Sequence, residues 1–228
     1  YCTVCRTGRV FDPTVRGKIE DFRLVGMDHY NAMFEDYSTK SWWRQANGEA
    51  IAGPLKGEKL RELPSRQMTL ASWLALYPNS LVLQPDTLFN KEYKELAAYD
   101  DGTITGSLEK RDSLSWKPKS FVVGITTQTS SKAYDWNELV ASKFIQDSLA
   151  DLHLLLTLEK DQSSFHTFNR VLNGTIYQFT LSSAGDQLVD LNTGSFWSFK
   201  GRCEAGKLMG AQLQTLQSYQ EFWHSWKT

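Results

Sequence analysis

The sequence predicts a β-rich α+β fold made of two similar halves, and two observations carry this prediction. Apolar residues alternate with polar ones around glycine-containing turns at several places along the chain, as expected of β-hairpins. In addition, Gly48–Trp73 matches Gly201–Trp226 without a gap, and 11 of these 26 positions are identical. A gapless match of this length indicates an internal duplication. We therefore expect two hairpin-containing halves related by an approximate two-fold axis.

Two hairpins are expected at equivalent places in the two copies. The first spans 8–25 around Arg16-Gly17, and the second spans 164–181 around Asn173-Gly174, a strong signal for a two-residue hairpin loop. If each ladder continues away from its loop, the register is fixed by the turn. It then predicts two aromatic cross-strand pairs, Phe11 with Phe22 and Phe168 with Phe179.

The remaining elements are shorter. Residues 122–136 and 149–160 read as strands, and the second of these is apolar enough to be central in a sheet. The helical candidates are few: Thr69–Tyr77, Lys91–Ala98, Trp136–Phe144 and Ser218–Trp226. Trp43 and Trp197 occupy matching positions in the two copies, so both are expected to be buried core residues.

The repeat also sets the expected organisation. The first repeat covers 1–97, a polar linker covers 98–119, and the second repeat covers 120–228, all within one compact unit. The second copy has sequence before its hairpin that the first copy lacks. We therefore expect this chain to be part of a longer protein, with a first repeat whose amino-terminal part is missing.

Composition excludes several classes of function. The 228 residues include 41% hydrophobic and 22% charged residues, which is ordinary for a globular protein. The net charge of −1 gives no reason to expect nucleic acid as a partner. No apolar run approaches the roughly 18 residues that a membrane span needs. Three cysteines exclude a full disulfide framework but allow one pair.

Each cysteine, and the cluster of Met27, His29 and Met33, is confined to one of the two copies. Thiolate, thioether and imidazole ligands together suit copper(I), and zinc if only cysteine and histidine bind. Continuing the first hairpin places Cys5 opposite Asp28, between Met27 and His29. The hypothesis is therefore a copper or zinc site built from these residues: Cys2, Cys5, His29, Met27 and Met33, with Cys203 and His224 as possible further ligands.

Two alternatives remain open. Cys2-x-x-Cys5 is spaced as a thiol–disulfide redox pair, and Arg6 favours a thiolate, although the sequence after the motif reads as a strand and not as the start of a helix. The other alternative is a metal-free ligand- or protein-interaction module. No nucleophile elbow or serine–histidine–aspartate spacing is present in the sequence, so the prediction leans away from an enzyme.

The residues also carry a family resemblance. The paired cysteines before "GRVF", the stretch "SWWRQANGEAIAGPLKGEKL" and "SYQEFWHSWKT" resemble the bacterial family catalogued as domain of unknown function 3179. The likeness runs over nearly the whole chain; Thr3 departs from it, because family members usually have proline after the first cysteine. The resemblance implies an exported or envelope location, periplasmic or lipid-anchored. It implies no particular activity.

Overall fold

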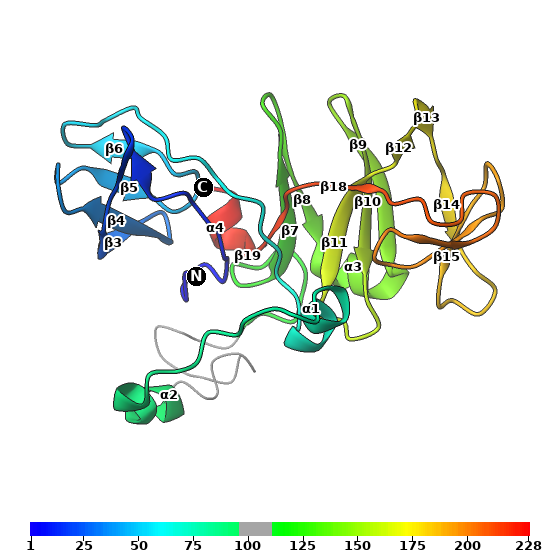
Figure 1. Ribbon diagram of the computed structural model, residues 1–228, viewed down its shortest axis with the longest axis horizontal. Coiled ribbons are helices and arrows are strands. Elements are labelled where there is room, and N and C mark those ends of the chain that lie inside the picture. Colours follow the sequence, from blue (N-terminus) through cyan, green and yellow to red (C-terminus); the bar gives the residue numbers. More distant parts are fainter. Residues whose placement is uncertain (96–110) are drawn as a thin grey trace. The chain divides into compact units, whose positions relative to one another are not determined.

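The structure is a computed structural model that describes residues 1–95 and 111–228. It is rich in antiparallel sheet and has few, short helices, which confirms the β-rich class (Figure 1). The chain forms two compact units, and each is assembled from separate segments. Unit 1 comprises Tyr1–Ser65, Val82–Val122 and Tyr219–Thr228, and unit 2 comprises Arg66–Leu81 and Val123–Ser218. The predicted linker, 98–119, lies largely outside the described residues.

Unit 1 is built around one antiparallel sheet. Its order is β3-β4-β5-β6, formed by β3 (Phe22–Asp28), β4 (Asn31–Asp36), β5 (Trp42–Arg44) and β6 (Ala50–Ala52). A separate two-stranded hairpin precedes this sheet and consists of β1 (Thr14–Val15) and β2 (Lys18–Ile19). The helical elements of this unit are η1 (Thr87–Phe89), α2 (Asn90–Glu95) and α4 (Trp223–Trp226).

Unit 2 contains two four-stranded antiparallel sheets. The first has the order β18-β11-β10-β9, with β9 (Phe144–Leu149), β10 (Leu152–Leu158), β11 (Phe165–Asn169) and β18 (Gln214–Thr215). The second has the order β14-β15-β16-β17, with β14 (Phe179–Leu181), β15 (Leu188–Asp190), β16 (Phe196–Trp197) and β17 (Cys203–Ala205). The hairpin of β12 (Val171–Leu172) and β13 (Thr175–Ile176) links β11 to β14 along the chain.

A further sheet has the order β19-β7-β8, formed by β19 (Tyr219–Phe222), β7 (Phe121–Thr126) and β8 (Ser131–Asp135). The boundary between the units falls within β7. Two helices of unit 2 begin at side-chain caps: Thr69 caps α1 (Leu70–Leu76) and Asp135 caps α3 (Trp136–Ser142). Each cap accepts a hydrogen bond from a first-turn N–H, which is how helix amino-termini are commonly satisfied.

Both predicted core tryptophans are buried, as expected. Trp43 is 2% exposed and Trp197 is fully buried. Each indole N–H donates to a buried carboxylate at 2.9 Å, Trp43 to Asp36 and Trp197 to Asp190. A buried polar ring atom needs such a partner, because an unmet donor is costly in a dry interior.

Three of the four predicted helices are confirmed in the described residues, and one prediction is wrong. Helices form at 70–76 and 136–142, and α2 covers the described part of the Lys91–Ala98 candidate. The prediction of one helix over Ser218–Trp226 is wrong, because Tyr219–Phe222 is strand β19 and only Trp223–Trp226 is helical. Aromatic residues fit a pleated surface well, and pairing within the sheet overrides weak helical periodicity here.

The predicted long hairpin registers are wrong beyond their turns. Val15 does face Lys18, and Leu172 does face Thr175. However, Phe11 bridges to Glu62, Phe22 pairs with Asp36, Phe168 pairs with Leu155 and Thr215, and Phe179 pairs with Asp190. In both hairpins the arms part because the residues beyond them pair with other strands, Phe22–Asp28 with β4 and Phe179–Leu181 with β15. Cys5 is therefore not placed opposite Asp28 by strand pairing, because Asp28 pairs with Asn31.

Candidate functional site at the paired cysteines

The first seven residues form a tight loop that folds the two cysteines toward each other. The Cys2 N–H donates to the Thr7 carbonyl at 2.9 Å, and the Arg6 N–H donates back to the Cys2 carbonyl at 2.9 Å. Arg6 has a φ of 61°, a left-handed conformation that closes the turn. Inside the loop the Cys5 N–H donates to the Cys2 sulfur at 3.4 Å. Both residues are free cysteines, and both are buried.

The two thiols differ in acidity. A hydrogen bond from the Cys5 thiol, joined by N–H groups of the loop, lowers the pKa of Cys2 in spite of its burial. The same pairing, together with burial, raises the pKa of Cys5. A thiolate and not a thiol is the nucleophile in sulfur chemistry. The arrangement therefore makes Cys2 the reactive sulfur and Cys5 the protonated one.

Two elements hold the loop from the side of Cys5. Gln45, which follows β5, accepts a weak hydrogen bond from the Cys5 sulfur at 3.8 Å and donates to the Thr7 carbonyl at 3.1 Å. In β19 the Phe222 N–H donates to the Cys5 carbonyl at 2.9 Å. These contacts fix the loop against two strands that lie far from it in the sequence.

A buried carboxyl group lies next to the dithiol. Glu221, also in β19, is 3% exposed, and its charge interacts with both cysteines. Burial raises the pKa of this carboxyl, against hydrogen bonds from Ser225 and Asn31 and the charge of Arg9. Ser225 in α4 donates to Glu221, and the Asn31 amide donates to Ser225 at 2.8 Å. The Asn31 Oδ1 atom is buried and has no hydrogen-bond partner among the described residues.

The tip of the β3–β4 hairpin covers the dithiol. His29 and Tyr30 form its two-residue loop, and both have positive φ, 47° and 71°. The Tyr30 carbonyl accepts a hydrogen bond from the Cys2 thiol at 3.5 Å, and its ring lies 4.2 Å from that of His224. Non-glycine residues held in left-handed conformations are often found at functional sites.

The predicted metal ligands do not all meet here. The structure brings Cys2 and Cys5 together and places His224 beside Tyr30. The His29 ring instead pairs with Asp28 at 2.7 Å, with its side chain 63% exposed. The remaining predicted residues lie as follows: Met27 is 58% exposed on β3, Met33 is buried on β4, and Cys203 is buried in the apolar core of unit 2. Across residues 1–95 and 111–228, no three His, Cys, Asp or Glu side chains are grouped to hold a metal ion.

Sequence reasoning missed Gln45, Glu221, Ser225 and Asn31, which surround the dithiol. Spacing in the sequence could not reveal them, because they come from three separate segments of the chain. One signal was available in the repeat comparison, where Glu221 stands against Met68 and Asn31 lies in a stretch, 25–35, that is three residues longer than its counterpart in the second copy.

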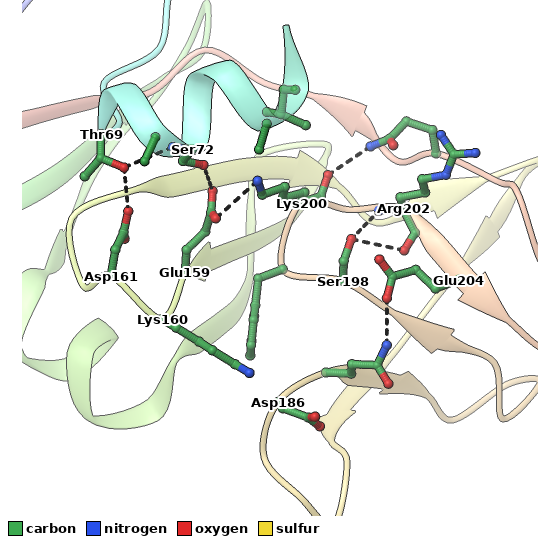
Figure 2. A pocket seen from close by; sticks show the side chains of 16 residues that line it. Thr69, Ser72, Glu159, Lys160, Asp161, Asp186, Ser198, Lys200, Arg202 and Glu204 are labelled. Carbon is green, nitrogen blue, oxygen red and sulfur yellow. Dashed lines mark hydrogen bonds and ion pairs between the residues drawn. The ribbon is translucent and has the colours of Figure 1, made fainter. Parts of the chain in front are cut away.

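Unit 2 has a second polar cluster, which lines a groove of about 680 Å³ (Figure 2). At its centre Glu159 accepts hydrogen bonds from Ser72 and from His166 at 2.7 Å, and Lys200 lies 3.4 Å away. The other acidic side chains that line the groove also accept hydrogen bonds: Asp161, Asp186 and Glu204. These carboxylates are engaged within the chain, so the dithiol of unit 1 is the stronger candidate for chemistry.

Comparison with protein families gives one match. The model of the family described as "Protein of unknown function (DUF3179)" covers residues 1–228. The chain belongs to this family. Neither the curated proteins nor the solved structures contain a match to this DUF3179 chain. Among its described residues, no helix is both long and apolar enough to cross a membrane.

Proposed function

We propose that this DUF3179 protein is a thiol–disulfide redox module, in which Cys2 and Cys5 form a reversible disulfide. The observation that carries the proposal is the loop geometry, with the Cys5 N–H on the Cys2 sulfur at 3.4 Å and both sulfurs within one closed turn. A donor aimed at the sulfur stabilises the thiolate, which is the state that attacks a disulfide.

The reaction balances as a two-electron exchange. The Cys2 thiolate attacks a disulfide of a partner molecule, forms a mixed disulfide and releases one partner thiolate. The Cys5 sulfur, as thiolate, then attacks the Cys2 sulfur and releases the second partner thiolate. The partner gains two electrons, and the loop ends as a Cys2–Cys5 disulfide. Reduction of the loop by a partner dithiol is the same sequence reversed.

An envelope location agrees with this chemistry. The family resemblance implies export, and disulfides form and persist in oxidising compartments outside the cytoplasm. We therefore place the redox module in the periplasm or at the envelope surface.

Soft-metal binding is the second candidate. Two buried thiols in one loop are also donors for copper(I) or zinc, and Met33, buried on the neighbouring β4, offers a thioether on the same unit. The third candidate is a metal-free interaction module in which the cysteines are inert packing residues.

One experiment separates the three. The reduced full chain is equilibrated with mixtures of glutathione and its disulfide, trapped with acid and analysed by mass spectrometry. We use a Cys203→Ala background, since the first copy has Ala50 at the equivalent place. The redox proposal expects loss of two hydrogens and a stable glutathione adduct in Cys5→Ser. Two unreactive thiols would overturn it, and so would stoichiometric zinc or copper(I) uptake that blocks the exchange.

We also propose that the two units arose by internal duplication. Three features support this: the sheets β3-β4-β5-β6 and β14-β15-β16-β17 share one strand order, the Asp36 and Asp190 hydrogen bonds match, and the Cys2–Thr7 backbone bond has a counterpart between Glu159 and Ser164. Superposition of Phe11–Trp73 on Phe168–Trp226 in an experimental structure tests it, and a different strand path would contradict it.

A further inference from the structure

We propose that Glu221 is the proton acceptor for Cys5 when the disulfide forms, and the proton donor when it is reduced. The inference rests on the proposed redox function and adds a carboxyl group to its machinery. On oxidation, the S–H proton of Cys5 passes to the Glu221 carboxylate, the Cys5 sulfur bonds to the Cys2 sulfur, and the partner thiolate leaves. On reduction, the Glu221 carboxylic acid returns its proton to the Cys5 sulfur.

The step needs an internal base because water cannot take this proton. Cys5 is fully buried, and its loop is closed by backbone hydrogen bonds on both sides. Burial raises the pKa of its thiol, and this cause remains when Cys2 is held in the mixed disulfide. A buried thiol with no base nearby would resolve a mixed disulfide slowly at neutral pH.

Glu221 is the titratable group placed to act. The Phe222 N–H to Cys5 carbonyl bond, 2.9 Å long, joins β19 to the cysteine loop directly beside Glu221. The charge of Glu221 interacts with Cys5, and that of Cys2 interacts with Glu221. Burial raises the pKa of the carboxyl, which brings it closer to the operating pH of a proton carrier.

The other ionisable groups around Glu221 are less suited. Arg9 faces it with a fixed positive charge, which holds the carboxylate form and cannot accept a proton. His224, in α4, packs its ring against Tyr30 and Phe222, and burial, Lys119 and Lys227 lower its pKa. Cys2 is itself the attacking sulfur.

Two donors in series hold Glu221 in its carboxylate form. Ser225 donates to Glu221, and Asn31 donates to Ser225. Both hydrogen bonds point toward the carboxylate, so they keep Glu221 ready to accept the Cys5 proton.

The test is the pH dependence of the resolving step. The Cys203→Ala chain, alone and with Glu221→Gln, is mixed with excess oxidised glutathione between about pH 5 and pH 9. Acid quenching and mass spectrometry separate the glutathione adduct from the internal disulfide. We expect Glu221→Gln still to form the adduct but to resolve it about 100-fold more slowly at neutral pH, the usual scale of general-base catalysis. Its resolution should then rise with pH as Cys5 ionises directly.

Glu20→Gln is the matched control, because Glu20 is a buried carboxyl of unit 1 hydrogen-bonded to Lys18 and Ser38, outside the dithiol network. It should resolve at the wild-type rate. Glu221→Asp should recover part of the rate. If Glu221→Gln fails to fold, Ser225→Ala takes its place and should slow resolution, because the carboxylate form of Glu221 loses a hydrogen-bond donor.

The outcomes are distinguishable. An unchanged resolving rate and pH profile in Glu221→Gln, with adduct and disulfide still forming, overturns this inference alone. Failure of the wild-type loop to form either species overturns the proposed redox function itself.

Discussion

The sheets β3-β4-β5-β6 and β14-β15-β16-β17 have the same strand order and differ in the length of the hairpin formed by their first two strands. In each, a tryptophan N–H bonds a buried aspartate at 2.9 Å, and a threonine hydroxyl bonds the same aspartate. The β3–β4 hairpin of unit 1 runs on to Asp28 and Asn31, whereas the β14–β15 hairpin of unit 2 ends at Leu181 and Leu188. The extra length is what reaches Cys2. The shared part is scaffold, and the part present once carries the candidate site.

The loops that precede the two sheets also share a backbone hydrogen bond and differ in their side chains. Glu159 bonds Ser164 through its backbone as Cys2 bonds Thr7. In unit 2, however, the side chain at this place is a carboxylate paired with His166 and Lys200. One loop holds a stabilising ion-pair network, and the other holds two thiols. The same backbone therefore supports two chemistries, set by a few side chains.

The largest expected effect comes from removing the shared tryptophans. Trp197→Ala and Trp43→Ala should each lower the free energy of unfolding by about 3–5 kcal/mol, because a cavity and a lost indole hydrogen bond add together. Trp197 packs in the larger buried cluster, so its loss should be the more severe. Denaturant unfolding of both variants checks the order. Equal losses, or a larger loss at Trp43, would contradict the comparison.

A second test uses Gly53 and Gly206, which directly follow the last strand of each sheet, β6 and β17. A Cβ at Gly53 would lie 2.7 Å from the Ser41 backbone, and one at Gly206 would lie 2.7 Å from Ser195 Oγ. Gly53→Ala and Gly206→Ala should each destabilise by roughly 1–3 kcal/mol, since φ is also positive at both.

Gly57→Ala and Gly210→Ala are the matched controls for those two changes. Both residues have positive φ, but a Cβ there meets nothing within 4 Å. They report the backbone strain alone and should lower stability less. Thermal unfolding of the four variants separates the two contributions. Control variants as unstable as the test variants would show that close packing against the serines is unimportant.

Glu221 gives a pH test that unit 2 lacks, because Met68 stands at the matching place. Burial raises the pKa of Glu221 above its unfolded value of about 4.3. The folded state then binds the proton more tightly, so this contribution to stability is full at low pH and is lost as pH rises. Glu221→Gln should therefore gain stability over the wild type as pH rises from about 4 to 8. Parallel stability curves for the two proteins would contradict this.

Sequence reasoning found the parts of the molecule that are local or shared. Trp43 and Trp197 were identifiable because both copies retain them, and Cys2 and Cys5 because only one copy has them. Glu221 differs between the copies as well, but its interaction with Cys5 joins residues more than two hundred positions apart, and spacing could not reveal it. The register that brought Cys5 to Met27 and His29 extended the first hairpin beyond Thr14 and Ile19, whereas Phe22–Asp28 pairs with β4 instead.

The smallest expected effect on stability concerns the hairpin tip that covers Cys2. His29-Tyr30 adopts positive φ at both positions, as Asn173-Gly174 does in unit 2 with φ of 50° and 77°. Asparagine and glycine adopt this turn readily, whereas histidine and tyrosine are strained there by about 1 kcal/mol per residue. Tyr30→Gly should thus relieve backbone strain and offset part of the loss of the ring contact with His224.

The same variant should uncover the reactive sulfur. Glycine keeps the carbonyl that accepts from the Cys2 thiol but removes the ring that anchors the tip on His224. The tip should therefore open more often, and alkylation of Cys2 by iodoacetamide should speed up severalfold at neutral pH, while the free energy of unfolding changes by less than about 1 kcal/mol. Tyr37→Gly, another exposed tyrosine of unit 1, is the control and should leave the alkylation rate unchanged. If Tyr30→Gly leaves the alkylation rate unchanged as well, the tip of the β3–β4 hairpin does not shield the dithiol. The greater length of this hairpin in unit 1 would then not be explained by protection of Cys2.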